Sequence, residues 1–366
     1  MKGLVIKSTG TSYGVWFPDG STLDCRVKGN FRIRGIRSTN PVAIGDYVEV
    51  VKGDTSAQGD ATHWITEVYD RRNYIIRRST NLSHESHILA ANIDLAALMV
   101  TINHPKTSTT FIDRFMATCE AYRVPACLIF NKVDLLTDNE RQQLADLRAL
   151  YESIGYKTYA ISALDTQSDD YKALLHVFAG GVEHPSPDMV PPSLRGLGGV
   201  SLLSGNSGVG KSTLLNAILG REVTRTGTIS TAHNKGMHTT TFSEMYPLPI
   251  PDVQLRSGAL GDDAARVVMT DISLSAPSLR GTGGVSWLID TPGIKGFGVL
   301  DMQREEVGHY FREIFRVGRD CRYSDCVHLD EPGCAVCEAV KSGNIAFSRY
   351  ESYLSMLGDI TENKYR

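Results

Sequence analysis

The feature that most constrains this chain is a glycine-rich segment, 205–212, with the pattern G-x-x-x-x-G-K-S. The apolar run 199–203 before it is typical of a buried strand, and the segment 213–220 after it is typical of a helix that ends at a glycine. A strand, a glycine loop and a helix in this order form a phosphate-binding loop. The backbone N–H groups of such a loop surround phosphate oxygens, and the helix N-terminus adds partial positive charge.

The residues of this loop indicate how a nucleotide would be held. Lys211 is expected to reach the β- and γ-phosphates, and the Ser212 hydroxyl is expected to bind Mg²⁺. The segment therefore predicts a nucleotide-binding α/β domain. The residues expected to contact the nucleotide are Gly205, Asn206, Ser207, Gly208, Val209, Gly210, Lys211, Ser212 and Thr213.

A second motif, N-K-x-D at 131–134, predicts which base is bound. It follows the apolar run 126–130, and ligands of open α/β sheets bind at the carboxyl ends of strands. The Asp134 carboxylate can accept hydrogen bonds from the N1–H and the 2-amino group of guanine, a pair that adenine lacks. Asn131 can tie the loop together and meet the other edge of the base, while the stem of Lys132 covers the ring.

The order of the nucleotide-binding segments is unusual. Ser162 and Ala163 end a further predicted strand, and the N–H of Ala163 could donate to guanine O6. These base-reading segments precede the phosphate loop, with the N-K-x-D motif about 75 residues ahead of it, whereas most GTPases have the reverse order. Because domain termini often lie close together and tolerate permutation, the sheet can still close. The sequence therefore predicts a circularly permuted P-loop GTPase domain.

Two later segments are expected to sense the γ-phosphate. The segment 290–293 has the pattern D-x-x-G after a predicted buried strand, so Asp290 would bind Mg²⁺ through water and the Gly293 N–H would meet the γ-phosphate. Between the phosphate loop and this segment, Thr240 is expected to complete the Mg²⁺ shell only when a γ-phosphate is present, although a neighbouring residue could serve instead.

The residue that positions the attacking water is not the usual one. Ile294 stands where Ras-like enzymes have a glutamine, and an isoleucine cannot orient water. His238, close to the predicted Mg²⁺ threonine, is the candidate catalytic residue. The alternatives are a loop histidine with no catalytic role and slow intrinsic hydrolysis.

Residues 1 to about 75 are expected to form a small β-barrel, for which an OB-fold is one candidate. Five short runs rich in β-forming residues are separated by turns, and they lie at 4–7, 12–17, 22–27, 47–51 and 63–68. The segment 26–37 holds five basic residues and no acids, and Arg71, Arg72, Arg77 and Arg78 follow. These residues are either a nucleic-acid-binding face or solvated basic loops.

The C-terminal part combines a helical pattern with a cluster of metal-ligand residues. Cys321, Cys326, His328 and Cys334 offer three thiolates and one imidazole within fourteen residues, the set of a structural Zn²⁺ site. A small loop with little apolar content gains its order from such a metal. Cys337 is a fifth candidate but lies beside the start of a predicted helix, so we leave it out. The alternative is a group of reduced, buried thiols.

These features divide the chain of 366 residues into an OB-fold at 1–75, a linker at 76–92, a GTPase domain at 93–298 and a zinc-binding helical module at 299–366. A segment rich in Pro, Gly, Ser and Asp at about 247–284 is expected to be an insertion in the GTPase domain. The sequence has no run of eighteen apolar residues, and its N-terminus is too polar for a signal peptide. We therefore expect a cytoplasmic protein without a membrane partner.

The five GTPase segments, taken in this order, resemble the circularly permuted RsgA (YjeQ) GTPases, which assist maturation of the bacterial small ribosomal subunit. The resemblance covers nearly the whole length, including the β module, the segments 90–94 and 236–240, and the Cys/His cluster. It implies GTP hydrolysis with His238 as the catalytic histidine. It also implies an N-terminal OB-fold that contacts ribosomal RNA and a zinc module that makes a second ribosome contact. The expected cofactors are one structural Zn²⁺ and the Mg²⁺ that accompanies GTP, and the expected form is a monomer.

Two other functions fit parts of the pattern. The absence of a glutamine at position 294 allows a zinc-containing rRNA-binding protein that uses GTP only as a structural ligand. The phosphate loop alone would also fit an ATPase, but Asp134 argues for guanine.

Overall fold

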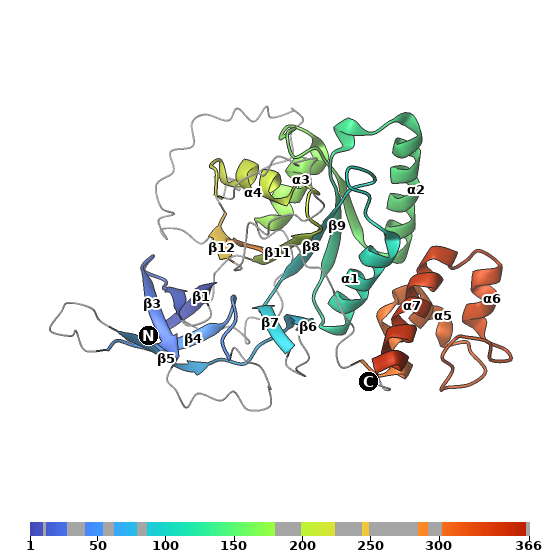
Figure 1. The fold of residues 1–366 in the computed structure, drawn as a ribbon, viewed down its shortest axis with the longest axis horizontal. Coiled ribbons are helices and arrows are strands. Elements are labelled where there is room, and N and C mark those ends of the chain that lie inside the picture. Colours follow the sequence, from blue (N-terminus) through green and yellow to red (C-terminus); the bar gives the residue numbers. More distant parts are fainter. Residues whose placement is uncertain are drawn as a thin grey trace, which may run out of the picture.

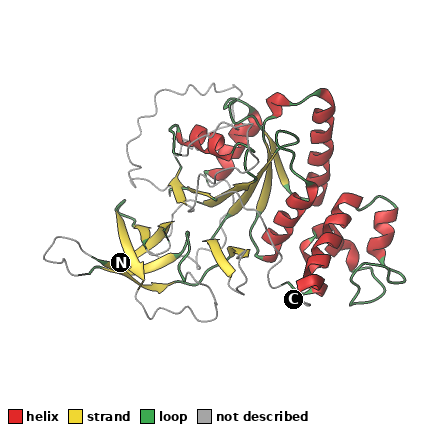
Figure 2. Cartoon of the chain, in the orientation of Figure 1, coloured by secondary structure: helices red, strands yellow, loops and turns green. Residues whose placement is uncertain are grey.

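The computed structural model of the chain describes residues 1–9, 12–27, 41–53, 62–78, 86–179, 199–223, 244–248, 285–291 and 302–363. A strand-rich N-terminal part, a central part of strands and helices and a helical C-terminal part follow one another (Figure 2). The N-terminal strands and the C-terminal helices lie on different sides of the central part, toward the lower left and lower right of the view (Figure 1). This arrangement confirms the predicted multidomain fold class.

The N-terminal part is a closed five-stranded barrel. Neighbouring strands follow the order β1-β2-β3-β5-β4, and β4 pairs back to β1. All pairs are antiparallel except β3 with β5, an arrangement that fits the predicted OB-fold. Apolar side chains from the strands, among them Val5, Val15 and Ile65, fill the interior. The strands are β1 (Lys2–Ser8), β2 (Tyr13–Trp16), β3 (Thr22–Val27), β4 (Tyr47–Val51) and β5 (His63–Val68).

The segment 76–92, which the sequence assigns to a linker, contains regular secondary structure. Its residues 76–78 and 86–91 belong to a two-stranded antiparallel sheet of β6 (Tyr74–Arg78) and β7 (Ser86–Ala91). The buried side chain of Asn73 closes one end of this hairpin, because it donates to the Ile93 carbonyl at 2.8 Å and accepts from the Ile93 N–H at 2.7 Å. This closure joins residues far apart in the sequence, which a periodicity analysis does not detect. The domain boundaries themselves remain predictions.

The central sheet places the strand of the phosphate loop in its middle. Its order is β10-β9-β8-β11-β13-β12, in which the first five strands are parallel and β12 is antiparallel to β13. β12 also pairs with β1, so the barrel strands extend the same sheet. The strands are β8 (Leu95–Val100), β9 (Ala126–Phe130), β10 (Lys157–Ala160), β11 (Val200–Gly205), β12 (Glu244–Pro247) and β13 (Trp287–Asp290).

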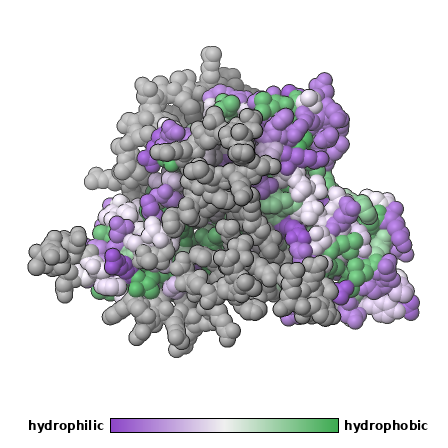
Figure 3. All heavy atoms as spheres, viewed as in Figure 1, coloured by the Kyte–Doolittle hydropathy of each residue, from purple (hydrophilic) through white to green (hydrophobic). Residues whose placement is uncertain are grey.

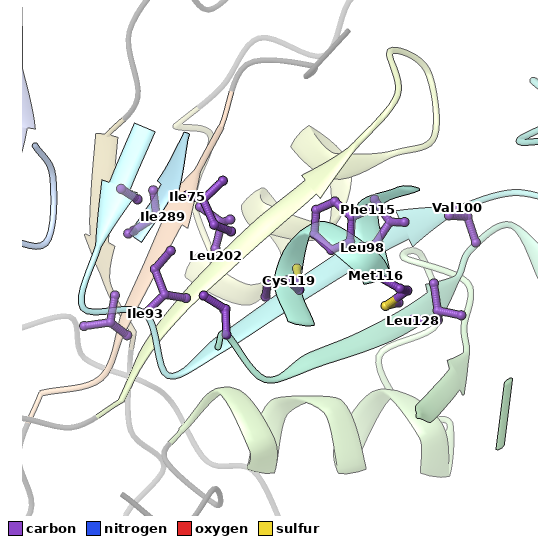
Figure 4. Packing of buried hydrophobic residues seen from close by; sticks show 14 of the residues in the cluster. Ile75, Ile93, Leu98, Val100, Phe115, Met116, Cys119, Leu128, Leu202 and Ile289 are labelled. Atoms are coloured by element: carbon purple, nitrogen blue, oxygen red, sulfur yellow. The ribbon is translucent and has the colours of Figure 1, made fainter. Parts of the chain in front are cut away.

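Helices cover both faces of this sheet. Alternate residues of a strand point to opposite faces, so Ala96 and Leu98 share a core with α1 and α2, whereas Ala97 and Met99 share one with α3 and α4. Figure 4 shows Phe115 of α1 packed beside Leu98. The outer surface of α2, at the upper right of Figure 3, is mainly hydrophilic. The helices are α1 (Thr109–Ala121), α2 (Asp138–Ile154), α3 (Asp169–Phe178) and α4 (Lys211–Leu219).

In the C-terminal part, α7 packs against α1 of the central domain (Figure 1). The predicted helical pattern of this part contains a break at Phe311, where a 3₁₀ helix gives way to α5, and Phe315 of α5 is 40% exposed. Among the described residues, no helix combines the length and apolar character that crossing a bilayer requires. The elements are the 3₁₀ helix Arg304–Tyr310, α5 (Arg312–Gly318), α6 (Ala335–Lys341) and α7 (Phe347–Asn363).

A buried ion network joins the C-terminal helices to the central domain. Arg349 of α7 donates to Asp113 of α1 at 2.6 Å and to both carboxylate oxygens of Glu313 in α5, at 2.6 and 3.1 Å. The hydroxyl of Tyr151 in α2 donates to Asp113 at 2.7 Å. All four side chains are buried. A buried charge that loses its partner strongly destabilises the fold, so this network fixes the position of α7 against α1.

We predict that Arg349→Ala lowers the free energy of unfolding by about 3–5 kcal/mol, because two buried carboxylates lose their cation. The matched control is Arg114→Ala at the same interface. Arg114 pairs with Asp359 at 2.6 Å, but these side chains are 21% and 44% exposed, so its loss is expected to stay within about 1 kcal/mol. Urea unfolding of both variants measures the difference. Equal, small effects would show that the network does not hold the module in place.

Candidate functional site

The glycine loop connects β11 to α4 as the motif requires. Gly208 and Gly210 have φ values of 84° and 103°, in the left-handed region that favours glycine. A Cβ on Gly210 would lie 2.3 Å from the Asn131 amide nitrogen, so this position also needs glycine for space. The loop therefore has the backbone shape in which successive N–H groups form an anion-binding concavity.

The charges of Lys211, at the start of α4, and Asp290, at the end of β13, influence each other. The Lys211 ammonium donates to the carbonyls of Gly205 and Asn206, at 2.6 and 3.0 Å. Burial raises the pKa of Asp290 to about 6, although the charge of Lys211 opposes this shift. Burial also lowers the pKa of Lys211. One oxygen of the buried Asp290 carboxylate has no hydrogen-bond partner among the described residues. Such incompletely satisfied charges fit a site for phosphate and a hydrated cation.

The side chain of Asn131 joins the three loops that the sequence assigns to the nucleotide. Its amide nitrogen donates to the carbonyl of Val209 in the phosphate loop at 2.8 Å. Its amide oxygen accepts from the backbone N–H of Ala163 at 2.9 Å. The Ala163 N–H, which we expected at guanine O6, is thus engaged by Asn131 in this structure. The side chain of Ser162 is buried in the same loop.

The other two residues of the N-K-x-D motif have different surroundings. Asp134 is exposed in the short 3₁₀ helix Val133–Leu135 and has no hydrogen-bond partner among the described residues, so its carboxylate is available to a base. Lys132 has a φ of 64°, and its ammonium donates to the carbonyl of His104 at 2.5 Å. Burial lowers the pKa of Lys132.

Some predicted site residues lie outside the part of the chain that the structure describes. These are His238, Thr240 and Gly293, together with most of the insertion and most of the basic segment 26–37. Arg71 and Arg72 are described and differ from their expected place on a basic face. Arg71 pairs with Asp46 at 2.6 Å and Arg72 with Asp94 at 2.7 Å, and all four side chains are buried.

The predicted metal ligands come together in the C-terminal part. The ligand atoms of Cys321, Cys326, His328 and Cys334 all lie within 4.8 Å of one another. The His328 Nδ1 atom is 3.5 Å from the Cys321 sulfur and 3.6 Å from the Cys334 sulfur, and these sulfurs are 3.9 Å apart. In a tetrahedral zinc site, N–S and S–S distances are about 3.5 and 3.8 Å. The cluster is therefore consistent with zinc.

The surroundings of this cluster orient its ligands. The hydroxyl of Tyr350 donates to the His328 carbonyl at 2.6 Å. The Glu331 carboxylate accepts from the N–H groups of Val327 and Leu329, at 2.9 and 2.7 Å. Burial lowers the pKa of His328, which favours the neutral imidazole that metals bind. The Cys337 thiol donates to the Leu329 carbonyl at 3.0 Å, outside the cluster.

Sequence reasoning missed one part of the nucleotide site. This part is the loop 101–108, between β8 and α1. Its His104 carbonyl accepts a hydrogen bond from the Lys132 ammonium, and its Pro105 ring lies beside Gly208 of the phosphate loop. The only signal was its place after a buried strand, because ligands of such sheets bind where strands end. No motif within the loop distinguished it.

Comparisons with known sequences agree with this geometry. The family model for the RsgA GTPase matches residues 68–184 and 188–253, and that for the RsgA N-terminal domain matches residues 2–59. The small ribosomal subunit biogenesis GTPase RsgA of Phocaeicola vulgatus is 49% identical over 366 residues, which cover 100% of this chain and 99% of the relative. The protein of the same name from Porphyromonas gingivalis is 47% identical over 367 residues, with the same two coverages.

Two solved structures are similar along the whole length. YjeQ from Thermotoga maritima matches with a TM-score of 0.63 and 26% identity, over 98% of each chain. YloQ, described as a circularly permuted GTPase, matches with a TM-score of 0.61 over 100% of this chain and 96% of its own; at 23% identity, this likeness concerns the fold alone. The sequence matches, the permuted strand order and the Cys/His cluster agree, and the chain belongs to the RsgA family of GTPases.

Proposed function

We propose that this chain hydrolyses GTP and that its nucleotide state controls its binding to, and release from, the small ribosomal subunit during assembly. The observation that carries the proposal is the Asn131 side chain, which holds the loops at 131 and 163 against the phosphate loop. The names of the relatives, small ribosomal subunit biogenesis GTPases, support the choice of partner.

Each residue at the nucleotide site has a proposed task. The N–H groups of 206–213 and the Lys211 ammonium bind the phosphates, and Asp134 selects guanine through N1 and the 2-amino group. Ser212, Thr240 and Asp290 would hold Mg²⁺, which would neutralise charge on the β- and γ-phosphates. The unpartnered oxygen of Asp290 supports its part in this set.

Hydrolysis needs a group that orients water toward the γ-phosphate. We assign this task to His238, because Ile294 has no polar atom on its side chain. Gly293 would contact the γ-phosphate through its N–H and lose that contact after hydrolysis. The switch segments would then relax, which is the step that releases the protein from its partner.

The flanking parts have proposed roles on the ribosome. The barrel would contact rRNA, which OB-folds bind through their strands and loops. The cluster of Cys321, Cys326, His328 and Cys334 would hold one structural Zn²⁺ that orders the C-terminal module for a second contact. The protein would act as a monomer in the cytoplasm. Its proposed units are 1–75, 76–92, 93–298 and 299–366.

We expect small ribosomal subunits to raise GTP turnover by at least about tenfold, which corresponds to about 1.4 kcal/mol of activation free energy. The measurement is phosphate release with small subunits, large subunits or neither. His238→Ala should keep the affinity for GTP and lose the stimulated turnover. No stimulation, with intact binding to small subunits, would favour the alternative in which GTP is only a structural ligand.

Replacement of the base-reading carboxylate should change nucleotide preference. Asp134→Asn is expected to weaken GTP binding about 10- to 100-fold, because hydrogen bonds to a charged group contribute about 1.5–3 kcal/mol. The same change should favour xanthosine triphosphate. Competition titrations with both nucleotides measure the shift, and Asp146→Asn, an exposed carboxylate on α2, is the control. Unchanged guanine preference would contradict the assignment of Asp134.

Two serine substitutions separate a metal ligand from its neighbour. Cys334→Ser should reduce the zinc content well below one ion per chain, because one of four ligands is lost. Cys337→Ser should keep the ion, because a hydroxyl can still donate to the Leu329 carbonyl. Elemental analysis of both purified proteins gives the stoichiometry. Loss of zinc from the Cys337 variant would place that residue in the metal site.

A further inference from the structure

The loop 101–108 occupies a place that the sheet order sets. β8 lies between β9, which leads to the N-K-x-D motif, and β11, which leads to the phosphate loop. All three strands are parallel, so their carboxyl ends meet at one edge of the sheet. The loop that leaves β8 therefore emerges between the base-reading loop and the phosphate loop. Its residues belong to none of the five GTPase segments.

On one side, this loop holds Lys132. The Lys132 ammonium donates to the His104 carbonyl at 2.5 Å. Both residues have left-handed backbones, with φ values of 64° for Lys132 and 61° for His104. For residues other than glycine such conformations are strained, and they persist at ligand clamps where the surroundings determine them. Two strained residues joined by a hydrogen bond thus mark this contact as one that the fold maintains.

On the other side, the loop lies against the phosphate loop. A Cβ built on Gly208 would be 3.4 Å from Pro105 Cδ and 3.7 Å from Pro105 Cγ. Gly208 is one of the glycines whose left-handed backbone shapes the anion-binding concavity. Pro105 is therefore placed to limit how far the phosphate loop can open toward β8.

Hydrogen bonds hold the loop in this shape. Within it, the Thr107 N–H donates to the Thr101 carbonyl at 3.0 Å, and the Thr107 hydroxyl oxygen accepts from the Thr101 N–H at 3.2 Å. From outside, the Glu140 carboxylate accepts from the Asn103 side-chain amide at 2.8 Å. Hydrogen bonds from the Thr137 backbone, and then from Asn103, lower the pKa of Glu140 to about 2, so it stays charged. The loop is thus tied to the start of α2.

We propose that the loop 101–108 is a positioning element of the nucleotide site, which anchors Lys132 over the purine and supports the phosphate loop at Gly208. A lysine side chain loses much rotamer freedom when it is fixed. The His104 carbonyl imposes that loss before the nucleotide arrives, so the nucleotide binds a preorganised side chain and retains more of its affinity. The inference rests on the proposed nucleotide site. His104 and Asn103 act through Lys132 and are positioning residues.

A double-mutant cycle tests this proposal. The affinity of the full-length chain for a fluorescent GDP analogue is measured for Asn103→Ala, Pro105→Ala and Lys132→Met, and for each loop variant combined with Lys132→Met. We expect Asn103→Ala and Pro105→Ala each to weaken binding three- to tenfold. In the Lys132→Met background, Asn103→Ala should change the logarithm of the affinity by less than half as much as it does in the wild-type background. If Asn103 had only a structural role, Asn103→Ala would weaken nucleotide binding by the same factor in the wild-type and Lys132→Met backgrounds.

The matched control is Gln142→Ala, which removes a similar amide–carboxylate hydrogen bond within α2, from Gln142 to Asp146 at 2.9 Å. It should leave the affinity unchanged. Equal effects of Asn103→Ala in both backgrounds, or unchanged affinity in both loop variants, would overturn the proposal. If Asp134→Asn weakens GDP binding while the loop variants do not, only the role of the loop is wrong. If the wild-type chain binds no GDP, the proposed nucleotide site is wrong as well.

Discussion

The nucleotide site depends on one buried amide. Asn131 has a donor and an acceptor in fixed geometry, and it uses the donor on the phosphate loop and the acceptor on the loop at 163. A buried amide without partners costs about 1–3 kcal/mol, so the three loops are most stable when they are together. A carboxylate at this position would lack the donor, and an aliphatic side chain would lack both groups. The motif therefore needs asparagine at this position for assembly of the three loops.

The strand order explains why chain permutation leaves this site intact. The loops meet because β9, β8 and β11 are parallel neighbours, and this adjacency does not depend on which strand comes first in the chain. Permutation does change where the switch segments lead, because the C-terminal helices now come after them in the chain. Those helices return to the central domain through Arg349, which binds Asp113 in α1. Because α1 begins at the loop 101–108, one helix connects the nucleotide site to the C-terminal module.

The features that the sequence predicted correctly depend on local patterns. The five barrel strands, the strand–loop–helix unit at 200–219 and the grouping of Cys321, Cys326, His328 and Cys334 all follow from spacing over a few residues. The pairing of β6 with β7 was missed because it is closed by contacts such as that of Asn73 with Ile93, 20 residues apart in the sequence. The burial of Arg71 and Arg72 was missed because their partners, Asp46 and Asp94, are 25 and 22 residues away in the sequence. The left-handed backbones at His104 and Lys132 depend on tertiary contacts, which residue type does not reveal.

The central claim is that one nucleotide lies between the N-K-x-D loop and the phosphate loop. The most direct measurement is a crystal structure of the protein with a non-hydrolysable GTP analogue and Mg²⁺. The account predicts that the Asp134 carboxylate accepts hydrogen bonds from guanine N1 and the 2-amino group, while Lys211 contacts the β- and γ-phosphates of the same molecule. A purine that lies away from Asp134, with its phosphates still in the glycine loop, would contradict it.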